Sequence, residues 1–161
     1  MSFLPIFLIN LDRSRHRLED VDKSMKQLGL DYERVPAIDG RVISTSDINA
    51  AYSHKLNAER YNYDLTQGEI ACYMSHRKAW QKLLDSDHQA AIILEDDIVL
   101  SPAFAHLHHA TAEIENSAYS DWDIIKLAQP FKPKESRQLD TIGDFQLVDY
   151  IKPPMGACGY L

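Results

Sequence analysis

Three adjacent carboxylates, Glu95, Asp96 and Asp97, directly follow an apolar segment at residues 90–94. An uninterrupted apolar run of this length is typical of a strand in a parallel sheet that helices cover on both faces. Ligands of such sheets bind just beyond the carboxyl ends of the strands. Because neighbouring acids repel one another, a hard divalent cation such as Mg²⁺ or Mn²⁺ would relieve them, and a diphosphate could complete its shell. A strand that ends in a solvated acidic turn accounts for the same residues equally well.

Basic residues follow the first apolar segment of the chain, at residues 3–11. If that segment is a parallel strand, they lie on the side of the sheet where ligands bind. The guanidinium groups of Arg13 and Arg17 could fork onto a phosphate or a uracil edge. Arg15 and His16 are interpreted as solvated residues of a first helical turn. The pattern leaves the role of Arg13 and Arg17 open.

Two further groups could ligate a metal by residue type. Cys72 and His76 are one helical turn apart, although a packed thiol beside a hydrogen-bonded imidazole is the favoured interpretation of such a pair. The imidazoles at positions 106, 108 and 109 fall mostly outside the apolar stripe of their expected helix. We therefore interpret them as surface residues.

Composition limits the classes of function. The chain has 161 residues, the size of one domain, and 24 acidic against 17 basic residues give it a net charge of −7. This balance argues against a nucleic-acid partner. The two cysteines, Cys72 and Cys158, show no paired spacing, so we expect a reducing cytoplasm rather than a disulfide framework. Residues 3–11 are too short to span a bilayer and lack the flanks of a signal peptide.

The elements that would position these residues belong to the α/β class. A strand at residues 3–11 precedes a helix whose apolar positions recur at helical spacing and which Gly29 ends. A second strand is expected at residues 32–38, and a strand–helix–strand unit of this length makes a parallel pair. Thr66 and Glu69 form a capping box for a helix that reaches about residue 85.

The remaining segments give weaker signals. Between residues 41 and 65 we expect a short helix capped by Ser46, with tyrosines that either fold over a ligand or lie half-buried on the surface. Ser101 and Pro102 begin another helix. Strands are expected at 122–127 and 145–151, and a loop at 129–144. The chain stops in what reads as a further strand, residues 153–161, and we therefore expect it to be shortened.

Three segments together resemble the family 25 glycosyltransferases, bacterial lipopolysaccharide-biosynthesis enzymes whose relatives include the collagen galactosyltransferases. They are residues 9–13 with Arg17, residues 65–76 with Trp80, and residues 93–97. Residues 36–40, 122–127 and 156–160 also look like family segments. The likeness covers nearly the whole chain, and the Thr-x-Gly-Glu…Ser-His block ahead of Glu-Asp-Asp is its most specific part.

The resemblance implies a GT-A-like fold, in which a Rossmann-like, mostly parallel sheet flanked by helices binds a nucleotide sugar. Glu95-Asp96-Asp97 would take the place of the Asp-x-Asp motif of that fold, with Asp97 coordinating Mn²⁺ (or Mg²⁺) at the diphosphate. The residues implied to contact the nucleotide sugar are Glu95, Asp96, Ser75, His76, Arg13 and Arg17.

The expected activity is the metal-dependent, inverting transfer of a hexose from a UDP-sugar to a lipooligosaccharide acceptor. Galactose is the expected hexose. Such an enzyme would work in the cytoplasm, as a peripheral protein of the inner membrane. Since family members run longer, residues 1–161 are expected to form one nucleotide-sugar-binding domain without the acceptor-binding part, and no general base is assigned.

The alternative is a catalytically silent nucleotide-sugar-binding module. A response-regulator-like acidic pocket is disfavoured, because Asp12 is the single acid directly after the first strand.

Overall fold

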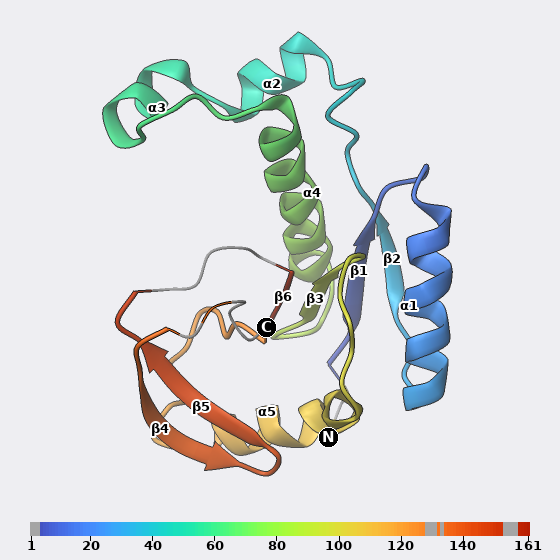
Figure 1. The fold of residues 1–161 in the computed structure, drawn as a ribbon, viewed down its shortest axis with the longest axis vertical. Coiled ribbons are helices and arrows are strands. Elements are labelled where there is room, and N and C mark those ends of the chain that lie inside the picture. Colours follow the sequence, from blue (N-terminus) through green and yellow to red (C-terminus); the bar gives the residue numbers. More distant parts are fainter. Residues whose placement is uncertain (1–3, 128–131, 133, 153–157) are drawn as a thin grey trace.

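Two sheets and a set of helices make up the computed structural model, which describes residues 4–127, 132, 134–152 and 158–161 (Figure 1). The first part of the chain contains β1 (Ile6–Asn10), α1 (Arg15–Leu28), β2 (Glu33–Pro36), α2 (Thr45–Ala51), α3 (His54–Arg60), α4 (Gln67–Leu84) and β3 (Ile92–Glu95). The second part contains the 3₁₀ helix η1 (Pro102–His106), α5 (Leu107–Glu115), β4 (Ser136–Ile142), β5 (Phe145–Tyr150) and β6 (Gly159–Tyr160).

The main sheet has the strand order β2-β1-β3-β6. β1 pairs in parallel with both β2 and β3, and β6 joins β3 in the antiparallel sense. Successive side chains of a strand point to opposite faces. Accordingly Leu8 and Leu94 share a core cluster with residues of α1, whereas Phe7 and Ile93 share another with Ala79 of α4. The α/β class and the mostly parallel sheet expected from the sequence are confirmed.

The path of the chain through this sheet reverses direction at β1. From β1 the chain passes through α1 to β2 on one side, and it then returns through α4 to β3 on the other side of β1. In open parallel sheets ligands bind at such a reversal, beyond the carboxyl ends of the two strands that diverge. Here those ends are Asn10 of β1 and Glu95 of β3.

Helix α4 begins as the sequence predicts. Thr66 and Glu69 form a reciprocal capping box, in which Thr66 Oγ1 accepts from the Glu69 amide and the Glu69 carboxylate accepts from the Thr66 amide. The start of α4 lies directly against the loop after β2, since a Cβ added to Gly40 would come within 2.8 Å of the Gln67 carbonyl oxygen. Glycine at position 40 therefore permits this close approach.

Three sequence-based expectations are wrong in detail. Residues 122–127 form no strand but one bridge, Lys126 with Tyr160, because their partner β6 is two residues long. The expected loop at 129–144 contains β4, whose alternation is masked by a bulge between Gln138 and Asp140. The helix after residue 41 is capped by Ser44 rather than Ser46, and a second helix, α3, follows it.

Other local predictions are confirmed. Gly29 ends α1 in the left-handed conformation, with φ 67°. Pro102 opens a 3₁₀ turn, after which the predicted inward residues Leu107, Thr111 and Ile114 of α5 are buried. The expected strand at 145–151 is β5, and part of the expected strand at 153–161 is β6, while residues 153–157 lie outside the described residues. Among the helices described, none has both the length and the apolar character needed to cross a membrane.

Candidate active site at the strand ends

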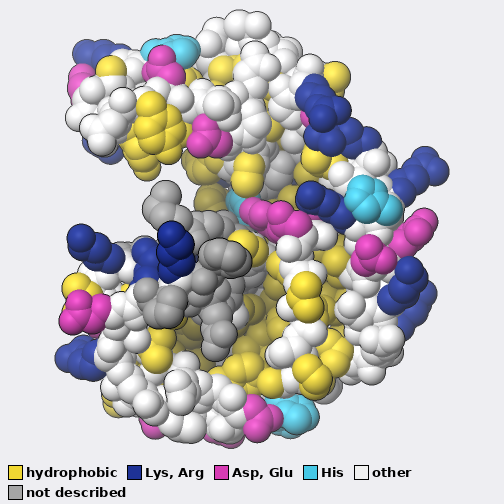
Figure 2. All heavy atoms as spheres, viewed as in Figure 1, with side chains coloured by type: hydrophobic (Ala, Val, Ile, Leu, Met, Phe, Trp, Pro, Cys, Tyr) yellow, Lys and Arg dark blue, Asp and Glu magenta, His cyan; other side chains and the backbone are white. Residues whose placement is uncertain are grey.

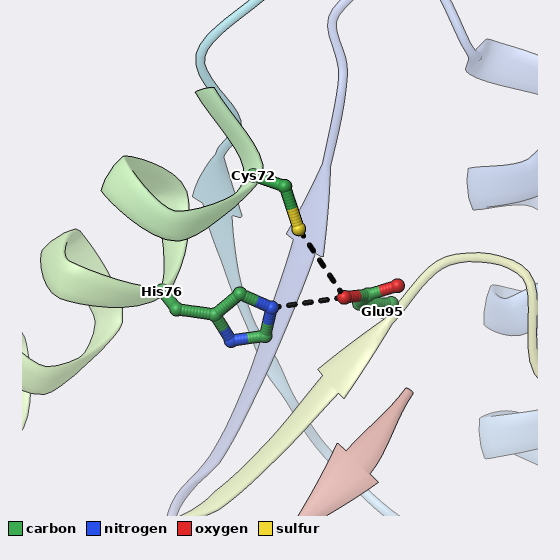
Figure 3. Close-up of side chains that lie close together, drawn as sticks. All are labelled: Cys72, His76 and Glu95. Atoms are coloured by element: carbon green, nitrogen blue, oxygen red, sulfur yellow. Dashed lines mark hydrogen bonds and ion pairs between the residues drawn. The ribbon is translucent and has the colours of Figure 1, made fainter. Parts of the chain in front are cut away.

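The three carboxylates after β3 do not form a single acidic cluster, because they face different elements. Leu94 packs toward α1, so Glu95, the next residue of the strand, points to the opposite face and meets α4 (Figure 3). Asp96, just past the strand, turns toward the end of β1. The sheet thus separates Glu95 from Asp96, and each carboxylate has its own partners.

Asp96 is held by polar groups that converge at the end of β1. The Asn10 side chain, almost fully buried, donates from Nδ2 to Asp96 Oδ2 at 2.6 Å. Arg17 of α1 lies 3.1 Å from Asp96 Oδ1. On its other side Asn10 Oδ1 accepts from Arg34 Nε of β2, whose guanidinium also pairs with Asp12. Asp96, whose side chain is 11 % exposed, is therefore fixed directly by neighbours from two elements, β1 and α1, and through Asn10 it is linked to Arg34 of β2.

Asp97 is the most accessible of the three acids. Its side chain is 52 % exposed, and its Oδ2 lies 3.8 Å from Arg17, a longer contact than the one Arg17 makes with Asp96. Figure 2 shows acidic and basic side chains side by side near the middle of the molecular face viewed, bordering a hollow. An exposed carboxylate beside a fixed one, at the ends of the two diverging strands, is suited to meet a ligand from solvent.

Glu95 ends a chain of hydrogen bonds that runs between α4 and the sheet. His76 Nε2 lies 2.9 Å from Glu95 Oε1, and His76 Nδ1 lies 2.8 Å from the Tyr160 hydroxyl, which also accepts from the Trp80 indole. An indole can only donate, so the Tyr160 hydroxyl is free to donate to Nδ1 and the Nε2 proton then goes to Glu95. This arrangement gives each of the four groups a hydrogen-bond partner, and the hydrogen bond from His76 lowers the pKa of Glu95.

Cys72 approaches the same carboxylate from one turn earlier in α4. Its Sγ lies 3.7 Å from Glu95 Oε1 (Figure 3). Although Cys72 is exposed as a residue, partial burial of its sulfur, together with the nearby Glu95 charge, raises the pKa of the thiol to about 11. Burial likewise raises the pKa of Tyr160 to about 12. Without a bound cation, both groups are therefore protonated at neutral pH.

The other two predicted ligand contacts, Arg13 and Ser75, do not touch Glu95, Asp96 or Asp97 through a described hydrogen bond or ion pair. Arg13 pairs with Asp39 at 2.7 Å, and this bond keeps the pKa of Asp39 below its usual range. Ser75 is buried, donating to the Ala71 carbonyl and accepting from the Ile38 amide. The structure therefore brings Arg17, Asp96 and Asp97 together on the α1 side of the sheet. His76 and Glu95 meet on the α4 side. Arg13 is partly exposed beside Asp39, and Ser75 is buried.

Sequence reasoning did not include Asn10, Arg34 or Tyr160 among the functional residues. A signal for Asn10 was present, because a polar residue that ends an apolar strand needs buried partners. The alternation of β2 could have marked Arg34 as lying on one face of the sheet. Nothing local marks Tyr160, since its partners Trp80 and His76 are brought to it by the pairing of β6 with β3.

A second hollow lies between α2, α3 and the start of α4. Tyr52, Tyr61 and Tyr73 are among its lining residues. The Tyr52 hydroxyl bonds to Asp64, whereas the Tyr61 and Tyr63 side chains are mostly exposed. The tyrosine-rich segment between residues 41 and 65 is thus largely helical and presents aromatic surface.

Comparison with known proteins shows which family the chain resembles. The family model described as glycosyltransferase family 25 (LPS biosynthesis protein) matches residues 3–161. Procollagen galactosyltransferase 2 of Mus musculus is 29% identical over 132 residues, which are 80% of this chain and 21% of that protein. A glycosyltransferase 25 family member of Aedes aegypti is 32% identical over 125 residues, 74% of this chain and 20% of that protein. The chain therefore spans about a fifth of the length of these relatives.

Proposed function

Because the chain belongs to glycosyltransferase family 25, we propose that it transfers a hexose from a UDP-sugar to a lipooligosaccharide acceptor, with inversion at the transferred carbon. The observation that carries this proposal is the placement of Asp96 and Asp97 at the reversal between β1 and β3. The words LPS biosynthesis in the family description support a lipid-linked saccharide as acceptor. The name of the mouse relative supports galactose as the sugar.

Asp97 is the proposed ligand of a divalent metal. Its carboxylate is half exposed and its contact with Arg17 is long, so it can turn to a cation without breaking a buried hydrogen bond. Carboxylate oxygens suit Mn²⁺ and Mg²⁺. When bound there, such an ion would stabilise the negative charge that develops on the departing diphosphate.

The protein's own side chains orient the donor. In this proposal Glu95 and Asp96 accept hydrogen bonds from ribose or sugar hydroxyls, and Asp96 is already held for this by Asn10. Arg17 and Arg13 lie on the open side of the same strand ends, where their guanidinium groups can bind the diphosphate or the base. Ser75 and His76 support the site from α4 as positioning residues, Ser75 by holding the Ile38 amide of the segment after β2 and His76 by orienting Glu95.

Residues 1–161 would then act as the nucleotide-sugar-binding domain of a peripheral enzyme at the cytoplasmic face of the inner membrane. Inverting transfer also requires a base that takes the proton of the acceptor hydroxyl as the new bond forms. Two events are therefore separable, metal-dependent donor binding at the strand ends and transfer to the acceptor.

The test is release of UDP from UDP-galactose or UDP-glucose, with Mn²⁺, with and without lipooligosaccharide. We expect faster release from UDP-galactose, dependent on acceptor, and loss of release in Asp97→Ala. The matched control is Asp87→Ala, since Asp87 is an exposed acid in the turn before β3. Undiminished release in Asp97→Ala would contradict the assignment, and donor binding without any release would favour the silent binding module.

A further inference from the structure

The structure brings together three different metal-ligating side chains on the α4 side of β3. Cys72 and His76 project from successive turns of α4, and Glu95 projects toward them from the end of β3 (Figure 3). One ligand atom from each, Sγ, a ring nitrogen and a carboxylate oxygen, lies within 4.8 Å of the others. The sequence alone offers only the pair of Cys72 and His76 as ligands, and the fold adds Glu95 as a third.

We propose that Cys72, His76 and Glu95 form a binding site for Zn²⁺ or a similar soft divalent cation. This site shares Glu95 and His76 with the proposed donor site, but it uses none of the Mn²⁺ ligation proposed at Asp97 and does not depend on that proposal. Thiolate and imidazole ligands favour zinc over manganese, whereas a site of carboxylates alone favours the harder ions.

Two of the three distances between the ligand atoms are close to those of a tetrahedral centre, and the third, between sulfur and the ring nitrogen, is within 4.8 Å. With ordinary zinc bond lengths, a tetrahedral site places sulfur about 3.6 Å from oxygen and nitrogen about 3.4 Å from oxygen. Cys72 Sγ is 3.7 Å from Glu95 Oε1, and His76 Nε2 is 2.9 Å from the same oxygen. The sulfur–oxygen pair needs no adjustment, and the nitrogen–oxygen pair opens by about 0.5 Å when the cation replaces the hydrogen bond.

The surroundings of His76 already provide the support that a metal-bound histidine needs. A ligating imidazole usually bonds a fixed polar group through its other ring nitrogen. His76 Nδ1 has the Tyr160 hydroxyl at 2.8 Å, and the Trp80 indole fixes that hydroxyl in turn. Because a hydroxyl both donates and accepts, Tyr160 can serve either tautomer, so Nε2 can lose its proton to bind a cation without leaving Nδ1 unsatisfied.

Exposure decides how a cation reaches the site. His76 is buried, whereas Cys72 is exposed, so the group opens to solvent on the Cys72 side. Three protein ligands leave the fourth tetrahedral position for water or a ligand oxygen. A cation held here would join α4 to the end of β3 and fix the orientation of Glu95 beside Asp96.

The test is titration of the chelator-treated full chain with Co²⁺, followed by displacement with Zn²⁺. We expect one cobalt per chain, a thiolate-to-cobalt charge-transfer band in the near ultraviolet, and displacement by Zn²⁺ but not by an equal concentration of Mn²⁺. Cys72→Ser should abolish the band, and Tyr160→Phe should weaken binding about 10–100-fold because His76 loses the hydroxyl that orients it. Since Cys72 is exposed, its serine variant should fold, which thermal unfolding checks.

Two control variants test whether the band arises from Cys72, His76 and Glu95. Cys158→Ser should keep the band, because the Cys158 side chain is not one of the three ligands. Cys158 contacts Glu95 through its backbone carbonyl, which accepts from the Glu95 amide. Asp97→Ala should also keep it, even if metal-dependent binding of UDP is lost. Absence of cobalt binding in the unmodified chain, or a band that persists in Cys72→Ser, would overturn the proposal.

Discussion

At the scale of single residues, Asn10 does more to organise the site than any of the carboxylates around it. It is nearly fully buried, and its amide joins Asp96 after β3 to Arg34 in β2. Replacing a buried side chain that bonds polar groups on both sides by an apolar one removes a hydrogen bond from each of those groups. Asn10 thereby sets the position of Asp96.

Asn10→Ala should lower the free energy of unfolding by about 1–3 kcal/mol, because Asp96 and Arg34 each lose a buried partner. Urea denaturation measures the effect. The matched control is Asn49→Ala, since Asn49 is exposed in α2 and its replacement should change stability by no more than about 0.5 kcal/mol. Equal denaturation midpoints for the two variants would show that the Asn10 hydrogen bonds add nothing to stability.

At the scale of elements, helix α4 carries two of the three candidate zinc ligands, Cys72 and His76. It also contacts the loop after β2. Its first turn is fixed by the capping box, in which the Thr66 amide and hydroxyl lower the pKa of Glu69. The carboxylate of Glu69 also lies at the positive end of the helix dipole. The ionised form of Glu69 therefore stabilises the folded helix more than the neutral form does.

A pH dependence follows from this lowered pKa. Since the pKa of Glu69 is lower in the folded than in the unfolded chain, its contribution is present above about pH 4.5 and lost as the pH falls through the folded value. Glu69→Gln should therefore destabilise the protein at neutral pH and become equivalent to the unmodified chain in acid. Urea denaturation at several pH values measures this, with exposed Glu59→Gln as control; a difference that does not change with pH would contradict it.

The elements show what the sequence could and could not predict. β1, β3, α1 and α4 were predictable because apolar periodicity and caps are local signals. β4 was missed because a bulge interrupts its alternation, and 122–127 was overpredicted because an apolar run does not report the length of its partner strand. The candidate site was predicted in part, since the acids and His76 were identified but the separation of Glu95 from Asp96 depends on which face each one meets.

At the scale of the whole molecule, Tyr160 connects segments that are far apart in the sequence. Through β6 it pairs with Ile93, and its hydroxyl bonds His76 and Trp80 of α4. These bonds link the sheet to α4 across the interior of the protein. The orientation of Glu95 therefore depends on residues about 65 positions further along the chain as well as on its own strand.

Tyr160→Phe should cost about 1–3 kcal/mol at neutral pH, because His76 and Trp80 lose their shared partner. The pKa of Tyr160 is raised to about 12, so the stabilisation that its neutral form provides is complete below about pH 10 and is lost as the pH rises through about 12. Unfolding measured at neutral and alkaline pH should show the gap between the unmodified chain and the variant closing. The control is Tyr63→Phe, whose side chain is exposed; a loss as large as that of Tyr160→Phe would contradict this account.

The most direct measurement is calorimetric titration of UDP into the protein with and without Mn²⁺, repeated with Asp97→Ala. The account predicts binding that requires the metal and is lost in the variant, while its thermal unfolding stays unchanged because Asp97 is half exposed and loosely paired. UDP binding that is the same with and without Mn²⁺, or that survives in Asp97→Ala, would contradict a metal–diphosphate site at the end of β3.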